Sequence, residues 1–166
     1  MRTVMPFLAL VLVSTVLFAQ QPAAPAAPKL FASSSDVAAM MAKAKNDRRA
    51  DQANFTQPLL QLAPITANLE YRVAMPQAAA VHEKEAEAFY VVDGSATMVT
   101  GGKLKDERRT NADNLTGTGV EGGMSRKIAK GDFILVPENT PHWFTDINGT
   151  VTLMSLHIPH TGAGTK

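Results

Sequence analysis

The chain has 166 residues, enough for one domain with a substantial hydrophobic core. It contains no cysteine, which excludes disulfides, zinc–thiolate sites and a cysteine nucleophile, so metal ligands must be nitrogen or oxygen donors. The formal net charge is only +1, so a nucleic acid or an acidic membrane surface has little electrostatic support as a partner.

Residues 1–19 have the pattern of a secretory signal peptide. Arg2 supplies a positive start, Val4 to Phe18 form an apolar run, and Ala19 ends it with a small residue before Gln20. The run is short for a membrane span, and no basic stop-transfer cluster follows it. We therefore expect cleavage near Ala19 and export to the periplasm or the medium, without stable membrane insertion afterwards. An uncleaved anchor is the rival interpretation.

Residues 20–32 are rich in alanine and proline and predict a stiff, extended spacer. Residues 33–58 predict a short helix and a connection, with an N-cap in Ser33 to Asp36. The apolar residues at helical spacing are Val37, Met40, Met41 and Ala44. Because this stripe is weak, we expect the helix to pack on the outside of the main domain or against a partner.

Residues 59–159 consist of short apolar runs separated by turn residues, which is typical of an all-β barrel or sandwich. The expected strands are Leu59–Leu62, Thr66–Met75, Ala79–Glu83, Ala88–Val92, Ser95–Thr100, Ser125–Ala129, Phe133–Val136, His142–Ile147 and Val151–Ile158. Residues 101–123 interrupt the pattern with glycines and mixed charges. They predict an exposed loop or hairpin arm that is mobile and not needed for folding. Residues 160–166 form a tail.

One stretch near the end of this region resembles the second motif of the cupins, a large superfamily of small β-barrels. Gly131, Pro137 and His142 have the motif's spacing, and an apolar run separates the glycine from the first proline. Asn139 stands where the motif has its second glycine, and Asp146 where it has asparagine.

An upstream stretch resembles the first cupin motif, in which two histidines precede a glutamate and a glycine. Glu87 and Gly94 fit that spacing, and His82 fits the second histidine. The first histidine corresponds to position 80, which is alanine. The resemblance implies a single-domain double-stranded β-helix, the jelly-roll barrel of the cupins, with the short helix added at its N-terminal side. It also implies pairing of subunits, most simply as a homodimer.

Strand periodicity gives the direction of the side chains in both motifs. With period two, Glu87 shares a face with Phe89, and His142 shares a face with Phe144 and Asp146. If both faces line the barrel, the polar residues meet at one end above an apolar floor. Asp146 is expected as a hydrogen-bond partner and not as a metal ligand.

The resemblance then predicts a metal site made of His82, Glu87 and His142. Two imidazoles and one carboxylate suit a divalent first-row ion (iron, manganese, zinc, nickel or copper) and leave positions for water and substrate. Ala80 permits two outcomes, a metal site with more open coordination positions or a site that binds its metal more weakly.

Two functional classes remain open. The first is a metalloenzyme, a dioxygenase, isomerase or lyase, acting on a small organic molecule, in which Glu85 or His157 moves protons. His157 could instead be an extra ligand. The second is a non-catalytic exported cupin that binds a small ligand, such as a sugar or a phenolic compound, and is metal-free if Ala80 marks the loss of the site.

Overall fold

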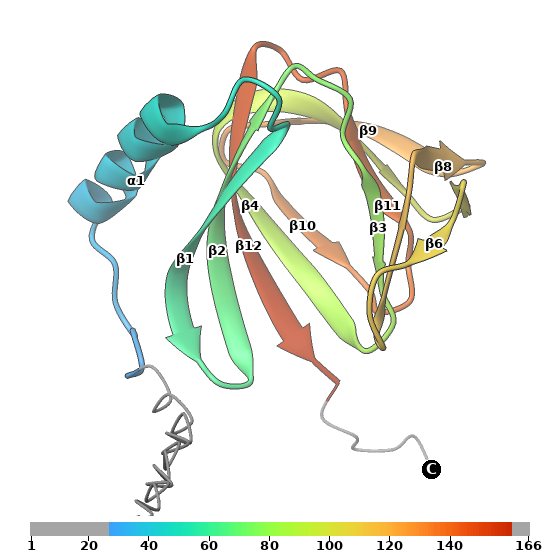
Figure 1. Cartoon of the computed structure of the whole chain (residues 1–166), viewed down its shortest axis with the longest axis horizontal. Helices are drawn as coiled ribbons and strands as arrows, with labels where there is room; N and C mark the ends of the chain where they lie inside the picture. Colours follow the sequence, from blue (N-terminus) through green and yellow to red (C-terminus); the bar gives the residue numbers. More distant parts are fainter. Residues whose placement is uncertain (1–26, 161–166) are drawn as a thin grey trace, which may run out of the picture.

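In a computed structural model, described for residues 27–160, the chain forms a curled antiparallel sheet with one helix beside it (Figure 1). The predicted signal peptide, most of the spacer and most of the tail lie outside the described residues. Within residues 27–160, no helix combines the length and the apolar character that crossing a membrane requires.

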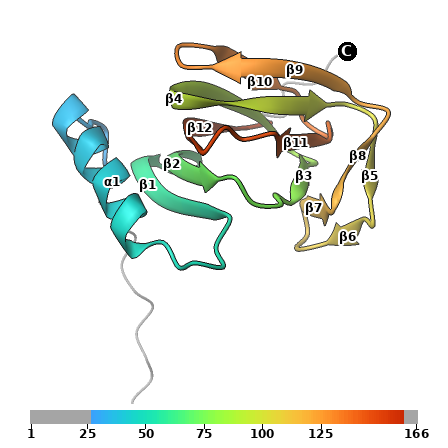
Figure 2. The ribbon, with the colours of Figure 1, turned by 90° about the horizontal axis from the view of Figure 1, so that it is seen from above.

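The helix α1 (Ser34–Asp47) begins where the sequence predicts it. Ser33 is the N-cap and forms a capping box with Asp36, which satisfies two of the unpaired backbone donors of the first turn. Ala44 is fully buried, and the Gln57 side chain donates to the Met40 carbonyl oxygen. The helix therefore packs on the outside of the strands β1 and β2, at one end of the molecule (Figures 1 and 2).

The strands of residues 27–160 are β1 (Asn54–Leu62), β2 (Ile65–Val73), β3 (Ala79–His82), β4 (Glu85–Thr100), β5 (Lys103–Lys105), β6 (Arg108–Arg109), β7 (Asn114–Gly117), β8 (Gly119–Glu121), β9 (Met124–Ala129), β10 (Phe133–Val136), β11 (His142–Thr145) and β12 (Thr150–Pro159). The first strand begins at Asn54, earlier than the expected Leu59. Proline in a sequence argues against a strand, so Pro58 concealed the first part of β1. It lies inside the strand at a register shift, one of the few strand positions that proline tolerates.

Two antiparallel sheets wrap around one core and share the strand β4. The first sheet runs β1-β2-β12-β4-β10, and the second runs β9-β4-β11-β3-β7-β6. The core residues between them are Phe89, Val91, Ala96, Met98, Ile128, Val136, Phe144, Ile147, Val151 and Leu153. The predicted all-β barrel class with one N-terminal helix is confirmed.

Strand β4 corrects the expectation of two separate strands, Ala88–Val92 and Ser95–Thr100. The chain continues through Asp93 and Gly94, with Val92 as the extra residue of a bulge opposite β12. The first half of β4 belongs to the first sheet and the second half to the second sheet. Gly94 has a φ of +81°, and a Cβ at this position would lie 2.1 Å from the carbonyl oxygen of Thr150. Asp-Gly signals a positive φ, and here that φ lies inside a continuous strand, two residues after the bulge, in place of a turn.

We predict that Gly94→Ala destabilises the protein more than Gly149→Ala. Both glycines have positive φ, +81° and +70°, so each alanine costs roughly 1–2 kcal/mol of backbone strain. Only Gly94 also has a backbone atom in the way, whereas nothing lies within 4 Å of a Cβ at Gly149. Overpacking should add roughly 1–3 kcal/mol at Gly94 alone. Thermal unfolding checks this, and equal losses in the two variants would show that Thr150 can move aside.

The 101–123 segment is only in part the arm that the sequence predicts. Strands β5 and β8 form a separate two-stranded sheet at the end of the molecule opposite α1 (Figure 2). Strand β7, in contrast, pairs along its whole length with β3, and the ring of Trp143 lies against Gly119. The expected exposed loop or hairpin arm is therefore wrong for β7, which extends the second sheet, and the expectation that the segment is mobile and not needed for folding stays a prediction. A four-residue strand rich in polar and small residues carries no alternation that would reveal it.

A buried ion pair fills part of the core on the first sheet. Arg72 donates from Nη2 and Nε to Glu70 Oε2 at 2.6 and 2.9 Å, and Ser155 Oγ donates to Glu70 Oε1 at 2.8 Å. Gln77 Oε1 accepts from Arg72 at 3.1 Å, and the guanidinium carbon lies 4.6 Å from the centroid of the Phe144 ring. Both charges are thus hydrogen-bonded as well as paired, as burial requires.

Candidate metal centre

The predicted site residues meet around the carboxylate of Glu87. This carboxylate is buried on β4, on the same face as Phe89, as the strand periodicity predicts. The Nε2 atoms of His82 and His142 each lie 3.2 Å from Glu87 Oε2. The Nε2 atom of His157 lies 3.3 Å from Glu87 Oε1. Three imidazoles therefore converge on one carboxylate.

Sheet register brings these residues together from three strands besides β4. His157 on β12 lies directly opposite Glu87 in the first sheet. His142 opens β11 and lies opposite Ala80 on β3, the strand that His82 ends. Neighbours across an antiparallel pair point to the same face, so His82, His142 and His157 all face Glu87.

Each histidine uses its other ring nitrogen to hold an oxygen atom. His82 Nδ1 donates to Asn114 Oδ1 at 2.5 Å, and His142 Nδ1 makes a longer contact of 3.4 Å with the carbonyl oxygen of Thr140. His157 Nδ1 donates to Glu85 Oε2 at 3.0 Å. With Nδ1 carrying a proton, each Nε2 makes a favourable contact with the Glu87 carboxylate when it carries a second proton or when a cation lies between the two atoms.

Two pKa shifts follow from this arrangement. Burial alone would raise the pKa of Glu87, but hydrogen bonds from His142 and His82 and the charges of His142 and His157 outweigh it. They hold the pKa of this carboxyl far below its usual range. Burial alone would lower the pKa of His82, but the hydrogen bond and charge of Glu87, with the Asn114 contact, raise it above its usual value. The arrangement therefore favours the anionic form of Glu87, which attracts cations or protons.

The residues of the cluster differ in exposure to solvent. The side chains of Glu87 and His142 are 4% and 6% exposed, whereas those of His82 and His157 are 18% and 19% exposed and that of Glu85 is 34% exposed. The floor below is apolar, since the rings of Phe89 and His142 have centroids 5.8 Å apart. A small molecule can approach along the exposed side.

The turn before His142 explains one departure from the cupin motif. Asn139 has a φ of +56°, the left-handed conformation for which glycine is the usual residue and asparagine the best-tolerated substitute. Its backbone N–H donates to the His82 carbonyl oxygen at 2.7 Å and ties the two halves of the site together.

Asp146 does not continue the inward face of β11. A φ of +46° ends the strand at Thr145, and the Asp146 side chain is exposed and accepts a hydrogen bond from the Thr145 hydroxyl at 3.2 Å. The expected shared face of His142, Phe144 and Asp146 is thus wrong at its last member, because the backbone turns there.

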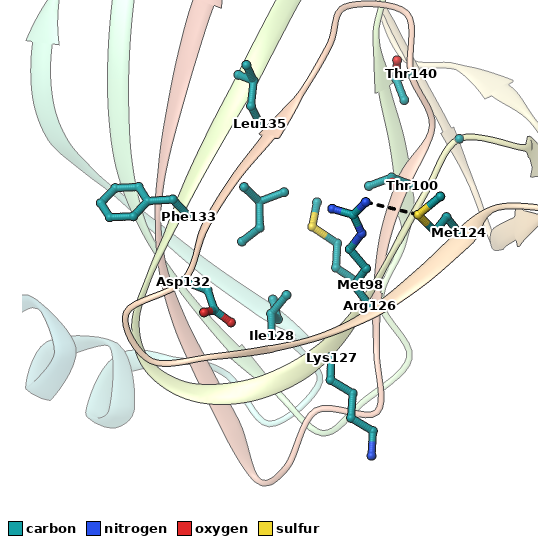
Figure 3. Close-up of a pocket in the computed structure, with 12 residues that line it drawn as sticks. Met98, Thr100, Met124, Arg126, Lys127, Ile128, Asp132, Phe133, Leu135 and Thr140 are labelled. Carbon is teal, nitrogen blue, oxygen red and sulfur yellow. Dashed lines mark hydrogen bonds between the residues drawn. The ribbon is translucent and has the colours of Figure 1, made fainter.

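A separate cavity of about 530 Å³ lies between the edge strands β9 and β10 (Figure 3). Figure 3 shows Arg126 directed toward Met124, whose sulfur accepts from the guanidinium at 3.3 Å. Thr100 and Thr140 are the lining residues that adjoin His142, and no histidine or glutamate lines the cavity. It is therefore distinct from the histidine cluster.

The metal ligands that the sequence predicts, His82, Glu87 and His142, have ligand atoms within 4.8 Å of one another. So do His82, Glu85 and His157, which brings the two expected proton-moving residues to the same place. Sequence reasoning missed Asn114, which orients His82 from the 101–123 segment. No local signal marks it, since its role depends on the pairing of β7 with β3.

No protein-family model matches the chain, and no curated protein matches its sequence. Solved structures match its fold. Iron(II) HppE is 17% identical with a TM-score of 0.50, over 66% of this chain and 53% of HppE. The hydroxypropylphosphonic acid epoxidase from S. wedmorenis is 18% identical with a TM-score of 0.50, over 64% of this chain and 51% of the epoxidase. The Cnp3 cupin domain of Schizosaccharomyces pombe is 12% identical with a TM-score of 0.49, over 67% of this chain and 68% of that domain. This chain thus spans about half the length of the first two.

Proposed function

The chain has the cupin fold, and from this premise we propose that it is an exported metal-binding cupin acting as a metalloenzyme on a small organic molecule. The observation that carries the proposal is the convergence of histidine Nε2 atoms on the buried Glu87 carboxylate, at 3.2 and 3.3 Å. Burying an anion at this point is costly unless a cation compensates it. The donor set of imidazole nitrogen and carboxylate oxygen suits iron, manganese, zinc, nickel or copper.

In this proposal His82, Glu87 and His142 hold the ion. A bound ion would supply Lewis acidity, or redox chemistry in the case of iron, manganese or copper. Phe89 and the strands around it exclude water from below. Glu85 and His157 stand on the exposed side, hydrogen-bonded to each other, as the groups of this chain that can hold or move a proton beside a substrate.

The substrate class is a small organic molecule. HppE has been solved with its substrate and with an alternative substrate, and the enzyme from S. wedmorenis is an epoxidase of hydroxypropylphosphonic acid. The partly exposed His82, Glu85 and His157 are the groups of the site that a substrate could contact. Dioxygenation, isomerisation and lyase chemistry are the reaction classes to screen once the retained metal is known.

Metal analysis of the purified protein tests the proposal. Dialysis against iron(II), manganese, zinc, nickel and copper in turn, followed by removal of free ions, should leave about one equivalent of at least one metal per chain. Retention of none of them contradicts the metalloenzyme. The chain would then be the non-catalytic, metal-free binding module that Ala80 leaves open.

We predict that metal affinity falls as pH drops, starting at a pH above the ordinary histidine pKa of 6.5. His82 must be neutral to bind a metal, and its pKa is raised above 6.5 by Glu87. Below that raised pKa, one proton competes with the metal, so the affinity should fall about tenfold per pH unit. In the metal-free protein the sign is opposite. There His82 contributes stability that is complete below pH 6.5 and is lost as pH rises through its raised pKa. Calorimetric titration and thermal unfolding across this range check both trends.

Export and self-association are further parts of the proposal. Export rests on residues 1–19, and mass spectrometry of the protein from its host should find a mature N-terminus near Gln20.

A homodimer is supported by large exposed apolar side chains, among them Leu30 and Phe31 beside α1 and Phe133 on the edge strand β10. Light scattering should give twice the monomer mass, and a monomer at micromolar concentrations contradicts the dimer.

A further inference from the structure

We propose that His157 is a fourth metal ligand, which takes the place of the histidine that position 80 lacks. This inference rests on the proposed metal site and adds to it a residue outside both sequence motifs. It makes the donor set three imidazoles and one carboxylate, drawn from β3, β4, β11 and β12. It leaves proton transfer to Glu85.

The geometry of His157 matches that of the other two histidines. Its Nε2 lies 3.3 Å from the Glu87 carboxylate, against 3.2 Å for His82 and for His142. Its ring centroid is 5.0 Å from that of His82, and the His82 and His142 centroids are 5.4 Å apart. As the direct neighbour of Glu87 across the β12–β4 pair, His157 points into the barrel by register.

The second ring nitrogen of His157 makes the kind of hydrogen bond that orients a metal-binding histidine. Metal-binding histidines usually donate their second N–H to a carboxylate, a carbonyl or an amide oxygen, which fixes the ring and its tautomer. His157 does so with Glu85 Oε2 at 3.0 Å, as His82 does with Asn114. Glu85 is therefore the positioning residue of His157.

The first histidine of the motif is replaced by Ala80, and in this proposal His157 supplies the missing imidazole. Ala80 lies opposite His142 on β3 and has no donor to offer. His157 reaches the same carboxylate from the first sheet. With four protein ligands, a six-coordinate ion keeps two open positions, enough for a substrate that binds through two atoms or for one atom and water.

X-ray absorption of the zinc-loaded wild-type protein tests the inference, because it counts imidazoles. We expect three. The spectrum of His157→Ala should show two imidazole ligands. Its zinc affinity should be about 100-fold lower than that of the wild-type protein, a larger loss than the removal of a residue that only orients a ligand would cause. His160→Ala is the matched control, since this histidine pairs with Glu138 at 2.9 Å outside the cluster. It should keep three imidazoles and wild-type affinity.

Glu85→Gln separates positioning from ligation. It should keep three imidazoles while lowering zinc affinity about 10-fold. A wild-type count of two, or a His157→Ala protein with unchanged spectrum and affinity, overturns the role of His157 and leaves the His82, Glu87 and His142 site intact. A wild-type protein that binds no metal defeats the proposed function itself. The wild-type count needs no variant, so a misfolded variant does not affect this result.

Discussion

Glu87→Gln is expected to lower the affinity for a divalent metal by about 1,000-fold. Total binding free energies of roughly 10–16 kcal/mol in structural zinc sites correspond to about 3 kcal/mol for each of four ligands. Glu87 should contribute more than this share, because it is the carboxylate on which all the Nε2 atoms converge. A loss of about 4 kcal/mol is about 1,000-fold. Competition with a chelating dye measures it.

The control for this substitution is Glu138→Gln, which removes the carboxylate of the exposed His160–Glu138 pair. It changes the same functional group beside a histidine and should leave metal affinity unchanged. Glutamine nearly conserves the shape of Glu87, so the barrel should stay folded. Near-normal affinity in Glu87→Gln would mean that the metal, if bound, lies elsewhere.

Glu70→Leu is expected to give the largest loss of stability, about 3–5 kcal/mol, because it leaves the Arg72 guanidinium buried without its anion. The pair is made by two contacts of 2.6 and 2.9 Å, and Ser155 Oγ also loses its acceptor. In a domain of this size the melting temperature should fall by roughly 6–20 °C. Calorimetry or denaturant unfolding of the metal-free protein measures it.

The double variant Glu70→Leu/Arg72→Met isolates the cause. Replacing both charges by apolar side chains removes the unpaired ion, so more than half of the lost stability should return. Asp51→Ala breaks the exposed Arg49–Asp51 pair, 3.2 Å long, and should change stability by less than about 1 kcal/mol. A double variant as unstable as Glu70→Leu would rule out the charge of Arg72 as the cause.

The sequence predicted which side chains of each strand point into the barrel, and this placed most of the candidate site residues. The alternation of Glu87 and Phe89 with less buried neighbours is a period-two pattern, and the structure confirms it. His142 and Phe144 follow the same rule. The resemblance to the cupin motifs then predicted that the stretches around Glu87 and His142 lie close together. Periodicity alone does not predict which distant strands are neighbours.

The contacts that Asn114 and His157 make could not be predicted from the sequence. Asn114 acts through the pairing of β7 with β3, a contact between segments 32 residues apart in a polar, glycine-rich stretch. His157 meets Glu87 only because of the register between β12 and β4, and the bulge at Val92 shifts that register. A one-residue slip would turn His157 to the opposite face.

The shared strand β4 also bears on how the metal would leave. Both edges of β4 are paired in each half, by β12 and β10 and then by β11 and β9, so its amide hydrogens should exchange with solvent only when the whole domain opens. Asn114 stands at the start of the four-residue strand β7, whose brief detachment costs far less. Such fraying would remove the hydrogen bond from His82 to Asn114 while Glu87 stays in the fully paired strand. Release of the ion should therefore proceed in steps, with an off-rate set by local fluctuations of β7 and not by global unfolding.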